Sequence, residues 1–114
     1  MTLKIKGVGI DCVEIKRFKR FIGNPKHPFL KKVFFVTELA HCFSYKNCAE
    51  HLAGIFAAKE AVSKALGVLS FPFAEIEIKH KKNGMPTPYL KGKKLSIKIS
   101  ITHTKTIACA IAVV

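Results

Sequence analysis

Apolar residues recur at helical spacing in three short segments of the N-terminal half of the chain. Before them, alternating apolar and basic residues with two glycines predict a strand over Leu3–Ile10. The three helical segments are Glu14–Ile22, which Gly23-Asn24-Pro25 ends, Pro28–Phe34, and a segment from Thr37, its expected N-cap, to Phe43.

The strongest helical pattern covers Ala49–Leu66. Alanine recurs there every four residues, which puts a narrow stripe of small side chains on one face and permits close approach to another element. Larger apolar residues widen this face, and Gly67 stands where a C-terminal cap belongs. The stripe consists of Ala53, Ala57, Ala61 and Ala65.

The C-terminal half has the period-two alternation of β-strands. It predicts strands over Glu75–Lys79, Ser96–Thr102 and Thr106–Val114, the last almost wholly apolar and therefore central. A break at His103–Lys105 would let the last two strands pair antiparallel. This order favours an α+β fold, a single domain over residues 1–114 with a long central helix packed on a mainly antiparallel β-sheet.

The composition is that of a folded protein. Hydrophobic residues make up 49% and charged residues 24% of the chain, which excludes a disordered tail protein. No stretch approaches about 18 uncharged apolar residues, so we expect no transmembrane helix. The N-terminus lacks the apolar segment of a secretory signal, so we expect a cytoplasmic protein. The 4 cysteines have no paired CxxC spacing, which argues against a zinc site and for reduced thiols.

Charge narrows the choice of partner. Lys and Arg number 20 against 7 Asp and Glu, a net charge of +13, which attracts nucleic acid, an acidic protein, anionic lipid or a phosphorylated small molecule. A basic nucleic-acid-binding domain is therefore one hypothesis. Against it, Trp is absent, Tyr occurs only 2 times, and the stacking motif of RNA-binding sheets is missing from the sequence.

Two of the few acids are candidates for chemistry. Asp11, the only aspartate, follows the predicted first strand; with Glu14 it fits a capping box for the next helix, or it is a ligand of a hard metal ion. Glu60 lies beside the alanine stripe. It forms an exposed i,i+4 pair with Lys64, or it is a second carboxylate facing Asp11. Two carboxylates and waters are a typical Mg²⁺ arrangement when a substrate phosphate completes the coordination.

Some histidines and lysines are candidates for binding phosphate. His103 stands among hydroxyl-bearing residues and Lys105, a polar cluster able to hold phosphate, although a lone histidine at a strand end is more often structural. Lys59 is expected at the surface or as a charge that steers phosphate. The remaining histidines share no metal-ligand spacing and are expected at the surface or satisfied by neighbours. They are His27, His41, His51 and His80.

Three blocks together resemble the holo-[acyl carrier protein] synthase family of phosphopantetheinyl transferases. They are Gly7–Ile15, Phe56–Gly67 and Ile99–Thr104, with weaker agreement in Phe35–Glu38 and Asn83–Pro86. The block in the long helix, FAAKEAVSKALG, is highly specific. Because order, spacing and length agree, the resemblance spans essentially the whole chain.

The resemblance implies transfer of the 4′-phosphopantetheine arm from coenzyme A to a serine of an apo-acyl carrier protein, in support of fatty acid biosynthesis. It implies that Asp11 and Glu60 bind Mg²⁺, which makes capping by Asp11 the minority interpretation. Lys64 and His103 are implied to bind coenzyme A and to act in catalysis with Glu60. The base that takes the serine proton stays open between Glu60 and a water on the metal beside Asp11.

Partners also follow from the resemblance. The family's partner is an acidic carrier protein, which implies contact through Arg17 and Arg20 of the first helix. The family's short members imply a homotrimer with coenzyme A bound between neighbouring subunits. The resemblance gives no role to nucleic acid or a membrane.

Two residues depart from the family pattern. Ile55 stands where many members carry an arginine, and Met85 stands where a lysine is common. Binding of a coenzyme A phosphate would weaken or move, and Lys46 or His51 would compensate. A catalytically silent homologue that only binds coenzyme A or carrier protein is a further alternative, against which the four implied site residues argue.

Overall fold

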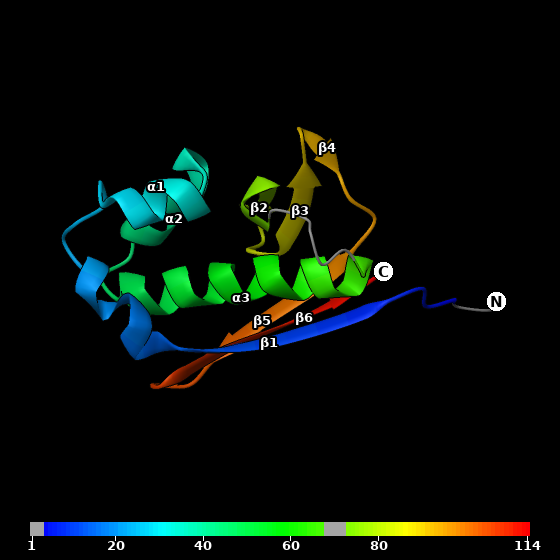
Figure 1. Ribbon diagram of the computed structural model, residues 1–114, viewed down its shortest axis with the longest axis horizontal. Helices are drawn as coiled ribbons and strands as arrows, with labels where there is room; N and C mark the ends of the chain where they lie inside the picture. Colours follow the sequence, from blue (N-terminus) through cyan, green and yellow to red (C-terminus); the bar gives the residue numbers. More distant parts are fainter. Residues whose placement is uncertain (1–3, 68–72) are drawn as a thin grey trace.

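A 19-residue helix, α3, lies between two groups of elements (Figure 1). The computed structural model describes residues 4–67 and 73–114. In chain order the elements are β1 (Val8–Glu14), η1 (Ile15–Phe21), α1 (Pro28–Val33), α2 (Val36–Phe43), α3 (Cys48–Leu66), η2 (Phe73–Glu75), β2 (Ile76–His80), β3 (Pro86–Leu90), β4 (Lys93–Lys94), β5 (Lys98–His103) and β6 (Ile107–Val113). The symbol η marks a 3₁₀ helix.

Two sheets flank α3. A three-stranded sheet in the order β1-β6-β5 covers one side, and α1, α2 and the sheet β2-β3-β4 lie on the other (Figure 1). All strand pairs are antiparallel. The α+β prediction, the central position of β6 and its antiparallel pairing with β5 are therefore confirmed. Strands β3 and β4 were not predicted. Pro86 and Pro88 obscure the strand pattern of β3, and β4 has only 2 residues.

The first strand begins and ends later than predicted. Leu3 lies outside the described residues, and β1 runs on to Glu14, paired along its length with β6. Asp11 therefore lies inside the strand, opposite Ala110, rather than after it. The capping-box interpretation is wrong, since η1 begins without a side-chain hydrogen bond at its N-cap. Pairing with β6, which is distant in sequence, overrides the local helix-start pattern.

Glycines and alanines bring α3 directly onto β1. A Cβ added at Gly7 would lie 2.1 Å from the carbonyl oxygen of Ala65, and one at Gly9 would lie 1.9 Å from that of Ala61. Such distances leave no room for any side chain, so both positions require glycine. The alanine stripe thus permits the predicted close approach, and its partner is the strand that carries Asp11.

The first helix is tighter than the predicted α-helix. Ile15, Phe18 and Phe21 are spaced by three residues, the period of a 3₁₀ helix, and all three are buried. Ile22, which the helical pattern included, is 56% exposed. The spacing therefore fixes one buried face of η1 and leaves its basic residues in solvent.

The predicted cap of α2 is also corrected. The N-cap is Phe35 rather than Thr37, whose hydroxyl instead donates to Glu77 Oε2 at 2.5 Å. The predicted long helix and its cap are confirmed, because α3 ends at Gly67 with a left-handed φ of 70°. No helix among the described residues is long and apolar enough to cross a bilayer.

Candidate active site

Strand β1 and helix α3 bring Asp11 and Lys64 together. The Lys64 ammonium donates to Asp11 Oδ1 at 3.3 Å and to the carbonyl oxygen of Ile10 at 3.0 Å. The Asp11 side chain is 19% exposed, so its carboxylate is mostly buried but still reaches solvent. Lys64 of α3 thus forms its ion pair with Asp11 of β1. The alternative ion pair with Glu60 is not formed among the described residues.

Glu60 of α3 lies near enough to Asp11 for the two charges to interact. Partial burial, and then the negative charge of Asp11, raise the pKa of the Glu60 carboxyl above its ordinary value. The positive charges of Lys64 and Arg17 act in the opposite direction. Since electrostatic repulsion requires proximity, the structure brings together the two carboxylates that the sequence singled out, with Lys64 beside them.

This donor set fits a small hard cation. Two carboxylates that repel each other are relieved by a divalent ion, and oxygen ligands suit Mg²⁺. Within residues 4–67 and 73–114, no group of three or more His, Cys, Asp or Glu side chains could hold a metal. A two-carboxylate site therefore needs waters or a substrate phosphate to complete the coordination, as Mg²⁺ sites commonly do.

Arginine lies next to this acidic pair. Both arginines of the chain, Arg17 and Arg20, are on η1. The Arg17 guanidinium lies over the Phe56 ring at 5.6 Å, and that of Arg20 lies 4.7 Å from the centre of the Phe21 ring. Arg17 also acts electrostatically on Glu60, a connection that sequence reasoning missed because the two residues are distant along the chain.

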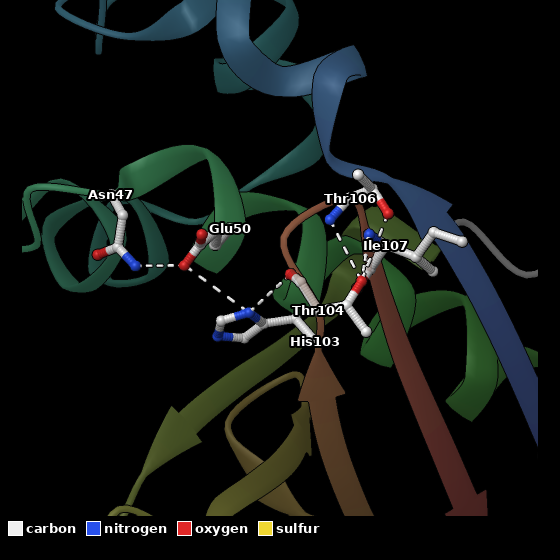
Figure 2. Close-up of polar contacts among 6 residues, drawn as sticks. All are labelled: Asn47, Glu50, His103, Thr104, Thr106 and Ile107. Atoms are coloured by element: carbon white, nitrogen blue, oxygen red, sulfur yellow. Dashed lines mark hydrogen bonds and ion pairs between the residues drawn. The ribbon is translucent and has the colours of Figure 1, made fainter.

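His103 occupies a different place, at the end of β5 (Figure 2). Its Nδ1–H donates to the Thr104 carbonyl oxygen at 3.1 Å and lies 3.7 Å from Glu50 Oε2. Glu50 in turn accepts a hydrogen bond from the Asn47 amide. The Thr104 hydroxyl accepts from the backbone N–H groups of the following turn, at Thr106 and Ile107. The turn and Glu50 thus fix the imidazole from one side.

Most histidines gather at His103 rather than at scattered surface positions. They line a pocket of about 530 Å³ together with Tyr45, Glu50 and the Asn83–Pro86 turn. We call it the histidine pocket. Its histidines are His41 of α2, His51 of α3, His80 of β2 and His103 of β5. Because four separate elements supply them, no local spacing in the sequence could indicate this pocket.

His27 is the one histidine outside this pocket, and a neighbour satisfies its side chain with a hydrogen bond, as predicted. Its Nδ1 accepts from the Phe29 N–H at 3.1 Å and caps α1. The two departures from the family pattern, Ile55 and Met85, both line the histidine pocket, as does the suggested substitute His51.

Lys59 is buried, so its predicted surface position is wrong. Its ammonium donates to Glu38 Oε1 at 2.6 Å and to the Val33 carbonyl at 2.9 Å, and both charged side chains have 0% exposure. Glu38 also accepts from the N–H of Ile78 on β2 at 2.7 Å. Burial raises the pKa of Glu38 and lowers the pKa of Lys59, so each charge depends on the other.

The candidate residues form two separate groups at opposite edges of one sheet, which we call half-sites: the group around Asp11 and the group around His103. Asp11 is on the edge strand β1 and His103 is on the other edge strand, β5, with β6 between them. Two strand spacings amount to about 10 Å. Of the predicted site residues, the structure brings Asp11, Glu60 and Lys64 together, but it does not bring His103 to them within one chain.

Comparisons with known proteins point to a single family. The model of a 4′-phosphopantetheinyl transferase superfamily matches residues 7–112. A "Holo-[acyl-carrier-protein] synthase" from Thermoanaerobacter sp. (strain X514) is 42% identical over 120 residues, which cover 93% of this chain and 86% of the relative.

Solved structures agree. A holo-(acyl-carrier-protein) synthase from Bacillus anthracis in complex with CoA (3′,5′-ADP) is 31% identical with a TM-score of 0.78, covering 96% of this chain and 95% of that one. A Helicobacter pylori holo-[acyl-carrier-protein] synthase in complex with coenzyme A is 32% identical with a TM-score of 0.77, covering 92% and 96%. Sequence and fold thus give the same family.

Proposed function

Because the chain belongs to the 4′-phosphopantetheinyl transferase superfamily, we propose that it transfers the 4′-phosphopantetheine arm of coenzyme A to a serine of an acidic apo-acyl carrier protein, with Mg²⁺ as cofactor. It is an enzyme of the holo-[acyl-carrier-protein] synthase type. The observation that supports the proposal is the ion pair of Lys64 with Asp11, together with the electrostatic interaction between Asp11 and Glu60.

Asp11 and Glu60 would hold the metal. Their mutual repulsion, which raises the pKa of Glu60, is what a divalent cation would relieve. When bound, Mg²⁺ supplies the positive charge that stabilises the pyrophosphate of coenzyme A as the transfer proceeds. Lys64 then exchanges its contact with Asp11 for a charge-assisted hydrogen bond to phosphate.

The reaction is a phosphoryl-type displacement. The serine hydroxyl of the carrier protein attacks the phosphorus that bears the pantetheine arm, a new P–O bond forms, and the bond to the nucleotide phosphate breaks. The serine proton passes to Glu60 or to a water beside Asp11, and adenosine 3′,5′-bisphosphate leaves. Lys64, which contacts Asp11 and is half exposed, would stabilise the leaving phosphate.

The histidine pocket is the proposed site for the nucleotide end of coenzyme A. Its volume of about 530 Å³ is within the range of small-molecule sites. His103 would contact the phosphate, since Glu50 and Thr104 hold its ring in place. His51 lies in the same pocket as Ile55 and Met85, the positions where many family members carry arginine and lysine. This supports the hypothesis that His51 supplies the positive charge that those residues would supply.

A homotrimer would join the two half-sites. If the β5 edge of one copy lies beside the β1 edge of the next, His103 of one subunit reaches the Asp11–Glu60 pair of its neighbour. Such a contact joins two different surfaces and closes into a ring. The sheet face turned away from α3 also exposes apolar residues suited to an interface, namely Val8, Ile10, Ile107 and Ile111.

Helix η1 is the proposed contact for the carrier protein. Arg17 and Arg20 are ordered against aromatic rings, and Arg17 lies close enough to influence Glu60. An acidic carrier docked there would present its serine at the metal pair. The net charge of +13 would speed this encounter at low salt.

The setting of the reaction is also a proposal. We assign residues 1–114 to one catalytic domain, acting in the cytoplasm in fatty acid biosynthesis, independently of nucleic acid and membrane. The free thiols of Cys12, Cys42, Cys48 and Cys109 are compatible with a reducing compartment.

Intact-mass spectrometry of an apo-acyl carrier protein tests the function. Incubation with this protein, coenzyme A and Mg²⁺ should add the mass of one phosphopantetheine arm, and a chelator should abolish the gain. A folded protein that binds coenzyme A yet leaves several carrier proteins unmodified would instead be a silent homologue. Mg²⁺-independent binding to generic DNA without transfer would favour the nucleic-acid hypothesis.

A further inference from the structure

The histidine pocket contains no permanent positive charge from the described residues. The chain carries 20 Lys and Arg, yet none of them lines this pocket. Four of the 5 histidines do, and Glu50 is the one acid among the lining residues. A pocket for an anion in so basic a protein would be expected to use lysine or arginine. Here its charge depends on protonation instead.

The rings form one connected group. His41 stacks on His80 with centroids 3.8 Å apart, and His51 stacks on Tyr45 at 3.7 Å. His51 joins the stacks, since its centroid lies 6.1 Å from that of His41 and 6.5 Å from that of His103. A proton on one ring is therefore felt by the others.

Three of the pocket's histidines are disfavoured as cations by their surroundings. Burial lowers the pKa of His41, His51 and His80, and for His80 burial and the neighbouring histidines lower the pKa to about 4. Glu50 opposes this for His51, but its carboxylate is already engaged by Asn47 and lies near His103. Tyr45 completes the titratable lining and contributes no positive charge.

We infer that the histidine pocket is a proton-linked binding site for a phosphate monoester, in which His51, at the centre of the ring cluster, takes up a proton when the phosphate binds. The inference rests on the proposed function for its ligand, the phosphate monoester on the ribose of coenzyme A. A phosphate dianion adds negative charge beside the rings, so binding and protonation favour each other. The affinity for coenzyme A then weakens as pH rises.

Isothermal titration calorimetry measures this linkage without carrier protein or metal. Coenzyme A is titrated into the full chain with a chelator present, at about pH 6.5 and about pH 8, in two buffers of different ionisation enthalpy. We expect uptake of about one proton per ligand and a Kd about tenfold weaker at the higher pH. Dephospho-coenzyme A, which lacks the monoester, should bind without proton uptake.

Two variants localise the effect. His51→Lys supplies a permanent charge, so its Kd for coenzyme A should stay tight at the higher pH and its proton uptake should fall. His27→Asn, a histidine substitution outside the pocket that keeps the α1 cap, should behave as the parent does.

Equal proton uptake with both ligands, a pH-independent Kd, or no binding at either pH would overturn the inference. The mass assay fails or succeeds separately. Proton-linked binding without transfer would keep this inference and refute the proposed function, and transfer with pH-independent binding would do the reverse.

Discussion

The variant Glu60→Gln is expected to lower the rate of phosphopantetheine transfer by at least about a hundredfold. Gln keeps the shape of the side chain but removes one of the two interacting carboxylates of β1 and α3. The substitution thus removes a proposed metal ligand and a candidate proton acceptor together. Single-turnover mass measurements on the carrier protein give the rate directly.

The same variant should be more stable than the parent without metal. The folded pKa of Glu60 is raised, so its ionised form is disfavoured in the fold, and stability falls as pH rises from the ordinary pKa through the raised one. Gln does not ionise, so the variant should not lose this stability as pH rises. Thermal melts should show a higher Tm for the metal-free variant, whereas Mg²⁺ should raise the Tm of the parent only.

A matched control is Glu14→Gln, which removes the exposed carboxylate that pairs with Lys16 at the end of β1. It should leave both the rate and the response to Mg²⁺ unchanged. The two-carboxylate account is wrong if Glu60→Gln transfers at the parental rate, or if Mg²⁺ stabilises parent and variant equally.

The variant Lys59→Met is expected to cost about 3–5 kcal/mol of unfolding free energy, a large part of a small domain's stability. Met matches the length of the Lys stem but leaves the Glu38 carboxylate buried without its cation. Glu38 joins α2 to the Ile78 N–H of β2, and Lys59 joins both to α3. Equilibrium denaturation measures the loss.

Two comparisons isolate the buried charge as the cause. The double variant Glu38→Gln with Lys59→Met neutralises both partners and should recover part of the loss. Lys16→Met breaks the exposed pair with Glu14, whose side chains are 75% and 59% exposed, and should change stability by less than about 0.5 kcal/mol. A Lys59→Met effect as small as that of Lys16→Met would show that the pair does not hold α2 and β2 to α3.

The local sequence pattern was sufficient to predict those elements whose own apolar spacing determines how they pack. The alanine stripe and Gly67 specified α3, its close contact and its end. The apolar run of β6 specified a central strand. The 3₁₀ character of η1 was present in the three-residue spacing of its apolar side chains, and it was misjudged because short α and 3₁₀ patterns differ by little.

The remaining features depend on contacts between distant segments. Lys59 carries a charge that predicts exposure, and its partner Glu38 lies 21 residues away on another helix. The histidine pocket draws its rings from four elements. Asp11 and Glu60 stood out because acids are scarce in this chain, and the family blocks made the metal-ligand interpretation the preferred one. The separation of these two residues from His103 follows from the sheet order, which no local pattern shows.

If neighbouring copies complete each other's active site, as we propose, two inactive variants should restore activity when they assemble together. Chains carrying Glu60→Gln and chains carrying His103→Ala, each inactive alone, are co-expressed and assayed for transfer to the carrier protein. In a randomly mixed ring, about one quarter of the interfaces would combine an intact Glu60 with an intact His103, so about a quarter of the parental activity should return. Mixed assemblies no more active than the two variants separately would contradict the claim, because both residues would then have to act within the same chain.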